Sequence, residues 1–204
     1  MKKEEKNGKN TRRKPSSKQK FLKAVGTILR KEGYRKLGVG RVAEVAGVDK
    51  SSLYHHFGSF DNLLEQYILA NDYWLGIIPT EIPGNDLIEA GKNMILHQFD
   101  SVIKNKEMQA FLRWELSESK GFPKYIAELR EEKAHDILQQ FQHSFKDSDV
   151  DPEMIAAILI SSIYYLILHR NQSKFCNIDI NQPEDVARLR KTIDKIVESL
   201  FKNG

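Results

Sequence analysis

The chain has 204 residues, of which 40% are hydrophobic and 29% charged, and its formal net charge is +4 at pH 7. That length is enough for one sizeable domain, or for a small domain joined to a larger one, with a buried core. The single cysteine, Cys176, excludes an internal disulfide framework, and the polar, lysine-rich first twenty residues are not those of a signal peptide. We therefore expect a cytoplasmic protein.

Positive charge is concentrated at the N-terminus. Residues 1–20 contain nine Lys or Arg and two Glu, a net charge of +7, so the rest of the chain has a net charge of −3. We expect residues 1–14 to form a disordered basic arm. Such an arm is either a solvated tail or, beside a nucleic-acid-binding element, a source of nonspecific attraction to phosphate.

Three helices are predicted after the arm. Apolar residues at helical spacing predict the first within "KQKFLKAVGTILRKEGY", where Gly33 gives a C-terminal stop. A short second helix covers "VGRVAEVA", residues 39–46. Gly47 then allows a tight turn, because glycine adopts the left-handed conformation at little cost. The third helix ends near Phe57 and turns Leu53 inward together with it.

The outer face of the third helix is polar and basic. Asp49 or Ser51 is its expected N-cap. A helix, a glycine turn and a second helix can place that second helix in the major groove of DNA, where these side chains would contact bases and phosphates. The exposed set is Lys50, Ser51, Ser52, Tyr54, His55 and His56.

Two other chemistries for this segment are disfavoured by spacing. Adjacent residues on a helix point about 100° apart, so His55 and His56 do not converge on one metal ion, and the chain has no HExxH or CxxC motif. Ser51 and Ser52 lack the glycines of a nucleophile elbow, and Cys176 has no histidine near it in sequence. We expect no metal, no cofactor and no catalytic site.

Several short motifs occur in a characteristic order along residues 15–75. They are Ala24, Gly33-Tyr34, Ala46-Gly47-Val48, Leu53-Tyr54-His55-His56-Phe57 and Leu63-Leu64. Together they resemble the N-terminal helix-turn-helix domain of TetR-family transcriptional regulators. The resemblance implies that Lys50 and Ser52 face bases, with Ser51 close by. It also implies that Tyr54 and His56 bind phosphates, and that His55 contacts base or backbone.

The chain departs from the family pattern at three places. Gly38 stands where the family usually has a Ser or Thr cap, and glycine caps less well by a few tenths of a kcal/mol. Phe60 replaces a lysine that binds phosphate in many members, so that contact is lost or supplied elsewhere, for example by the arm. Gly40 stands where some members contact DNA, and we take Arg41 as the substitute. The predicted DNA-contacting residues are Gly38, Arg41, Lys50, Ser51, Ser52, Tyr54, His55 and His56.

Six further helices are predicted, giving an all-α fold of about nine helices. They cover about residues 60–78, 86–105, 107–117 and 123–145, a segment that starts at Pro152, and residues 183–202. The apolar run at 154–168 is shorter than the ~20 residues of a membrane span, so we interpret it as a buried helix rather than a membrane segment.

The resemblance also implies a domain organisation. Residues 15–75 would form the DNA-binding domain, and residues 76–204 a larger helical domain that binds an effector and forms a homodimer through the last two helices. An unbroken apolar stripe on the last helix agrees with this, although a monomer core could absorb the same stripe.

The effector pocket is less well defined by the sequence. Helices five to eight carry candidate side chains, namely Met94, His97, Phe99, Phe111, Trp114, Glu115, Tyr125, Tyr164, Tyr165 and His169. Aromatic residues at helical spacing are more often plain core than part of a ligand site. Glu115 continues an apolar series, so its carboxylate requires a partner: His97, Arg113, Tyr165, a cationic ligand or a helix-end salt bridge. The predicted pocket consists of Trp74, His97, Phe111, Trp114, Glu115 and Tyr165.

These features predict a DNA-binding transcriptional regulator, a ligand-responsive repressor that binds a palindromic operator as a dimer. Its partners would be a double-stranded DNA operator and a small-molecule effector. Two alternatives stay open: an α-helical small-molecule-binding protein or enzyme without a DNA-binding role, and a membrane-surface module that uses the arm.

Overall fold

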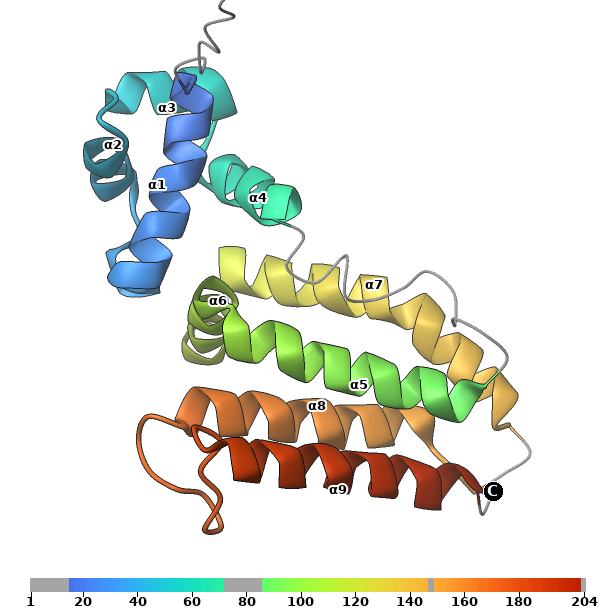
Figure 1. Ribbon diagram of the computed structural model, residues 1–204. Helices are drawn as coiled ribbons and strands as arrows, with labels where there is room; N and C mark the ends of the chain where they lie inside the picture. The colour runs from blue at the N-terminus through green and yellow to red at the C-terminus, as the bar shows by residue number, and fades with distance from the viewer. Residues whose placement is uncertain (1–14, 72–85, 147–148, 203–204) are drawn as a thin grey trace, which may run out of the picture.

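The computed structural model describes residues 15–71, 86–146 and 149–202, with side chains described to residue 199. In these ranges the chain is helical, as predicted, and has a single isolated β-bridge between Phe175 and Ile178. The helices form a small N-terminal unit that stands on a longer helical body (Figure 1). The elements are α1 (Ser17–Lys31), η1 (Tyr34–Lys36), α2 (Val39–Ala46), α3 (Lys50–Phe57), α4 (Phe60–Asn71), α5 (Leu87–Lys104), α6 (Lys106–Ser117), α7 (Phe122–Ser144), α8 (Pro152–His169) and α9 (Pro183–Lys202).

The first helix is set by its N-cap and by its buried face. Ser16 and Gln19 form a capping box, in which each side chain accepts a hydrogen bond from the other's backbone N–H. Phe21 lies against Phe57 of α3 in an edge-to-face contact, with ring centroids 6.1 Å apart. This contact joins the start of α1 to the end of α3. Gly33, with φ of 78°, follows the end of the helix.

The turn between α2 and α3 has the predicted glycine geometry. Gly47 is left-handed, with φ 62° and ψ 41°, and the N–H of Val48 donates to the carbonyl of Ala43 at 3.2 Å. Leu53 and Phe57 are buried, as expected. Asp49 is the N-cap residue of α3, but its side chain makes no capping hydrogen bond. The backbone turn, rather than that side chain, therefore sets where α3 begins.

The fourth helix connects the N-terminal unit to the body. Four apolar residues on one face are buried against the unit: Leu63, Leu64, Tyr67 and Ile68. The sequence predicted that this helix extends to residue 78. Residues 72–85 lie outside the described ranges, and the described part of the helix ends at Asn71.

The body is built around α5. Helices α8 and α9 pack against α5, and α7 packs on α6 and α8. Within the body, α6 is the helix that packs against α1 and η1 of the N-terminal unit (Figure 1). Each of α5, α6 and α8 starts with an Asp or Asn side chain that accepts hydrogen bonds from the first turn, namely Asp86, Asn105 and Asp151. Pro152 occupies the first turn of α8, as predicted.

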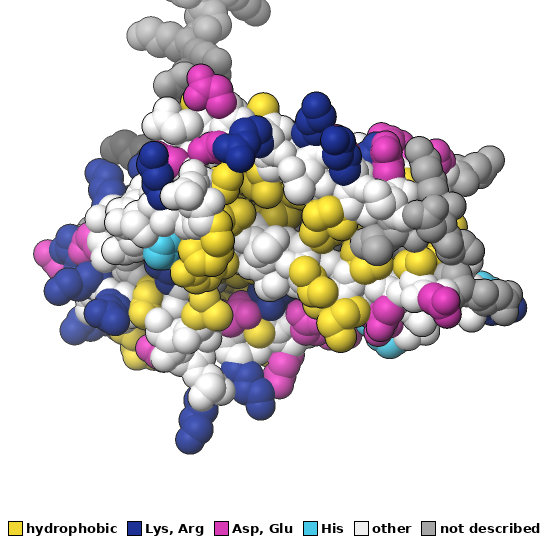
Figure 2. Space-filling model, turned by 90° about the horizontal axis from the view of Figure 1, so that it is seen from below, with side chains coloured by type: hydrophobic (Ala, Val, Ile, Leu, Met, Phe, Trp, Pro, Cys, Tyr) yellow, Lys and Arg dark blue, Asp and Glu magenta, His cyan; other side chains and the backbone are white. Residues whose placement is uncertain are grey.

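Helix α8 is apolar nearly all round, but only part of its surface is covered. By length and composition it is the one helix in the described ranges that could cross a membrane, yet here it packs against α5, α6 and α7. Its uncovered side exposes Met154, Ile158 and Tyr165. Figure 2, which views the molecule from the side where α8 and α9 lie, shows hydrophobic side chains across the middle of this face.

Candidate nucleic-acid interface and body cavity

The predicted reading face of α3 is exposed while its apolar face is fixed in the core. Leu53 is fully buried and Phe57 is 4% exposed, whereas Tyr54 is half-exposed. The other polar residues of the set are at least partly accessible to solvent: Lys50, Ser51, Ser52, His55 and His56. The helix therefore holds its polar side chains in a rigid row, as direct contact with a groove requires.

The two ends of this face contact neighbouring helices. The Lys50 side chain lies over Gly40, where a Cβ would make an ordinary contact with the ammonium nitrogen at 3.5 Å. The ammonium of Lys18 lies 5.7 Å from the centre of the Phe57 ring, next to the end of α3. Helix α2 thus places its backbone, and α1 a cation, beside the exposed polar face of α3.

Arg41, which was predicted to contact DNA, is held by carboxylates. Its guanidinium donates to both oxygens of Glu32, at 3.0 and 2.8 Å, and lies 2.8 Å from a Glu44 oxygen. The hydrogen bond to Glu32 is the main reason that the pKa of Arg41 is raised, and Arg41 in turn lowers the pKa of Glu32. A phosphate would have to compete with these carboxylates for Arg41. Gly38 begins α2 without any side-chain cap.

His55 and His56 show no metal-binding arrangement. Their ring centroids are 5.4 Å apart in an edge-to-face contact. In the part of the chain that the structure describes, no group of three or more His, Cys, Asp or Glu side chains gathers. Both rings remain available as hydrogen-bonding groups on the exposed face.

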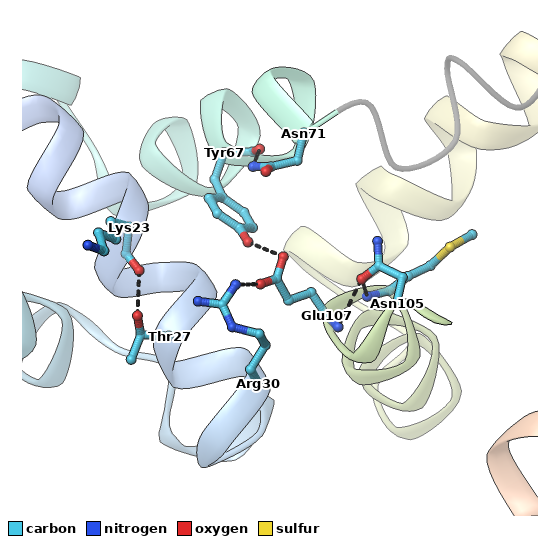
Figure 3. Close-up of polar contacts among 8 residues, drawn as sticks. Lys23, Thr27, Arg30, Tyr67, Asn71, Asn105 and Glu107 are labelled. Carbon is cyan, nitrogen blue, oxygen red and sulfur yellow. Dashed lines mark hydrogen bonds and ion pairs between the residues drawn. The ribbon is translucent and has the colours of Figure 1, made fainter. Parts of the chain in front are cut away.

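A buried carboxylate joins the N-terminal unit to the body. Glu107, at the start of α6, accepts hydrogen bonds from Arg30 of α1 and from the Tyr67 hydroxyl of α4, the latter at 2.5 Å (Figure 3). Burial and the bond to Glu107 raise the pKa of Tyr67. The contact needs Gly26 on α1, because a Cβ there would lie 2.5 Å from the Tyr67 hydroxyl oxygen. Three helices therefore meet at one carboxylate.

An aromatic stack lies beside this carboxylate at the same junction. Tyr34 of η1 stacks on Trp114 of α6, with centroids 5.9 Å apart and planes 12° from parallel. Its hydroxyl donates to Ser117 at 2.9 Å. Trp114 also stacks on Phe111 and contacts Phe122 of α7. These rings form a second contact between the N-terminal unit and α6.

The body contains a cavity of about 540 Å³ between α5, α7 and α8. Most of its wall is apolar, and its polar groups are Gln98, Arg130, Glu131, Glu153, Ser161 and Tyr164. Gln98 donates to the Tyr164 hydroxyl. Arg130 donates to both oxygens of Glu115, at 2.8 and 2.9 Å, and lies 3.5 Å from Glu131. Cavities of this size and wall composition are typical of small-molecule sites.

The comparisons with known proteins agree with this geometry. Residues 16–67 match the sequence model described as "Bacterial regulatory proteins, tetR family". Residues 16–67 therefore form a TetR-family N-terminal domain. None of the curated protein sequences matches it.

Solved TetR-family structures share the fold over most of the chain. A TetR family transcription regulator from Marinobacter aquaeolei VT8 is 17% identical, with a TM-score of 0.64 over 88% of this chain and 94% of the other. The fatty acid degradation regulator FadR from Bacillus halodurans is 14% identical, with a TM-score of 0.63 over 87% and 96%. A TetR-family regulator from a Rhodococcus species is 20% identical, with a TM-score of 0.62 over 90% and 98%. The fold of the body is therefore a TetR-family fold.

The six residues predicted for the effector pocket do not form one cluster. Trp74 lies outside the described residues. Phe111 is buried core, and Trp114 belongs to the aromatic junction. His97 and Tyr165 are exposed on the surface of α5 and α8. Only Glu115 adjoins the cavity, through Arg130.

Sequence reasoning missed the residues that define the cavity's polar end and the junction. Tyr164 was considered among many aromatics, but Gln98 and Arg130 were not. The contact of Glu107 with Arg30 and Tyr67 was also missed. A buried Glu within an apolar stretch was the available signal, and it pointed to Glu115 without naming its partner.

Proposed function

We propose that this DNA-binding transcriptional regulator is a repressor that binds a palindromic operator as a homodimer in the cytoplasm. It acts by binding rather than by catalysis, and a small-molecule effector releases it from the operator. The observation that carries the proposal is the α3 face. Its polar side chains are exposed, while Leu53 and Phe57 fix the helix in the core. That arrangement suits direct contact with a major groove.

The apolar side of α8 supports a homodimer through α8 and α9. Met154, Ile158 and Tyr165 are exposed on α8, and Ile196 of α9 is 37% exposed. Large apolar side chains gathered on one face mark an interaction surface. Pairing this face with the same face of a second copy would form a four-helix interface and hold two α3 helices about 34–36 Å apart.

Helix α6 supports a route from the cavity to the DNA-binding unit. Glu115, near its end, binds Arg130 at the cavity. Glu107, about two turns earlier, binds Arg30 of the N-terminal unit and Tyr67 of the connecting helix α4. A ligand that moved one end of α6 would therefore act on the other. A coupling of about 1–3 kcal/mol would change operator affinity about 5- to 150-fold.

The DNA-binding part is tested by selecting bound fragments from genomic DNA and then measuring variants on the selected operator. Tyr54→Phe should weaken binding to all sequences, because we assign Tyr54 to phosphate. Lys50→Ala should relax specificity at symmetric positions by about 1–3 kcal/mol each. Arg41→Ala is the matched control, since Glu32 and Glu44 already hold that cation. A larger loss for Arg41→Ala than for Lys50→Ala would mean that α2 and α3 dock differently.

A further inference from the structure

A cavity that is open to solvent on one side separates two hydrophobic clusters of the body, which suggests that a ligand completes the packing between them. One wall includes Ile95 and Leu159 of the main core cluster, and the opposite end includes Ile137 and Phe141 of a separate cluster. The space between them exists because small side chains line it from three helices: Gly91, Ala134, Ala156 and Ala157. An unfilled volume of this kind loses the dispersion contacts that a bound apolar molecule would supply.

The cavity is elongated and has two unlike ends. On α7 its lining runs from Arg130 to Phe141, a helical rise of about 16 Å. Helix α5 has Gln98 at the end near Arg130, and has Gly91 near Phe141, where a Cβ would lie 3.6 Å from the ring. One end is therefore polar, and the other is mostly apolar, with the exposed Glu153 of α8 at its edge. Because C–C bonds of about 1.5 Å at tetrahedral angles advance about 1.25 Å each, a chain of ten to twelve carbons is about 11–14 Å long and fits within this length.

The charge of Arg130 at the polar end is balanced by Glu115. Arg130 is the cation in the lining, its side chain is 15% exposed, and Glu115 binds its guanidinium with both oxygens. The remaining carboxylates of the lining, on Glu131 and Glu153, are exposed to solvent. A carboxylate ligand that approached Arg130 would be repelled by Glu115. An ammonium ligand that approached Glu115 would be repelled by Arg130. Each charged ligand would thus lose its hydration without an unopposed counter-charge.

Neutral hydrogen-bonding groups complete the polar end. Gln98 is 6% exposed and bonded to the Tyr164 hydroxyl, and Ser161 lies on the same helix as Tyr164. We propose that the cavity binds an uncharged amphiphile, a straight chain of about ten to twelve carbons that carries a hydroxyl or carbonyl group. The oxygen would bind among Gln98, Tyr164 and Arg130, and the chain would extend toward Phe141. This inference rests on the proposed function, in which the cavity is the effector site.

The first test compares three ligands of equal length and different charge: decan-1-ol, decanoate and decylammonium. Binding to the full-length protein is measured by isothermal titration calorimetry at about pH 8, where the acid and the amine are both charged. Decan-1-ol should bind about tenfold more tightly than either ion. If decanoate or decylammonium binds as tightly as decan-1-ol, the proposal is wrong.

The second test changes the charge of the polar end. Glu115→Gln removes the negative charge that binds Arg130 with both oxygens, so the affinity for decanoate relative to decan-1-ol should rise about tenfold. Glu128→Gln is the matched control, because it removes an exposed α7 carboxylate that pairs with Lys124 and does not line the cavity. An unchanged ranking in Glu115→Gln would contradict the assignment of the head group to Arg130. The double variant Glu115→Gln, Arg130→Gln restores neutrality and should again prefer decan-1-ol.

The third test places the ligand in the cavity. Ala134→Phe fills the middle of the lining and should abolish decan-1-ol binding while leaving operator binding intact. If this variant binds decan-1-ol as tightly as the unaltered protein does, the ligand does not bind in this cavity and the proposal is wrong. Because the titrations contain no DNA, failure of the amphiphile to bind is distinguishable from failure of the protein to bind an operator.

Discussion

The N-terminal unit and the body differ in how completely they fill their cores. In the N-terminal unit, Phe21, Ile28 and Leu53 are fully buried and the polar residues of α3 are displayed outward. The body instead contains a cavity of about 540 Å³ and leaves one side of α8 uncovered. A rigid unit suits fixed contacts with DNA, whereas an incomplete core suits a region whose packing depends on a ligand and on a second subunit.

The largest expected effect compares core substitutions in the two regions. Phe21→Ala removes a fully buried ring that contacts Phe57, so it should lower the free energy of unfolding by about 3–5 kcal/mol. Ala134→Leu adds apolar volume to the cavity and should be neutral or stabilising by up to about 1 kcal/mol. Urea unfolding measures both. A strongly destabilising Ala134→Leu would show that the body is as tightly packed as the N-terminal unit.

A smaller effect is expected at the junction between the regions. Glu107→Ala removes the acceptor for Arg30 and leaves the buried Tyr67 hydroxyl without this bond. The loss should be about 2–3 kcal/mol in the free energy of unfolding. Glu118→Ala is the control, since Glu118 is an exposed residue just beyond the same helix. If the two variants are equally stable, the Glu107 contacts do not stabilise the junction between the regions.

Two helix glycines provide a closer comparison. Alanine normally stabilises a helix interior over glycine by about 0.5–1 kcal/mol. Gly91→Ala in the body meets only an ordinary contact with Phe141 at 3.6 Å, so it should show that gain. Gly26→Ala places a Cβ 2.5 Å from the Tyr67 hydroxyl, so a net loss of about 1 kcal/mol is expected. Thermal unfolding of the two variants shows whether each is more or less stable than the parent protein. A stabilised Gly26→Ala would mean that the Tyr67 side chain moves aside at little cost.

The smallest effect concerns alkaline pH. The pKa of Tyr67 is raised by burial and by Glu107, so the folded state retains its proton where the unfolded chain loses it. This contribution is complete below about pH 10, the ordinary tyrosine value, and is lost as pH rises from there toward the folded pKa. Tyr67→Phe should therefore flatten the fall in unfolding free energy above pH 10, as measured by urea unfolding at a series of pH values.

The two regions also differ in how much of their structure could be predicted from the sequence. The turn at Gly47 and the inward pair Leu53 and Phe57 follow from local spacing, and the structure confirms them. The ion pairs of Arg41 with Glu32 and of Glu115 with Arg130 join residues on different helices, and helical spacing does not say which helices meet.

The body was harder to predict for a physical reason. When a helix is apolar nearly all round, as α8 is, periodicity does not tell which face is covered, so Tyr164 at the cavity and Tyr165 at the surface look equivalent in sequence. The cavity depends on small residues from three helices that are far apart in the chain. That arrangement arises only from tertiary packing.

Trp114 gives the molecule an intrinsic optical probe. Indole emission depends on the ring's immediate surroundings, and this indole lies between Tyr34 of the N-terminal unit and Phe122 of α7. The chain has two tryptophans, so a Trp74→Phe variant emits from Trp114 alone. Its fluorescence would then report, without any attached dye, whether the N-terminal unit remains seated on α6 as ligand or DNA is added.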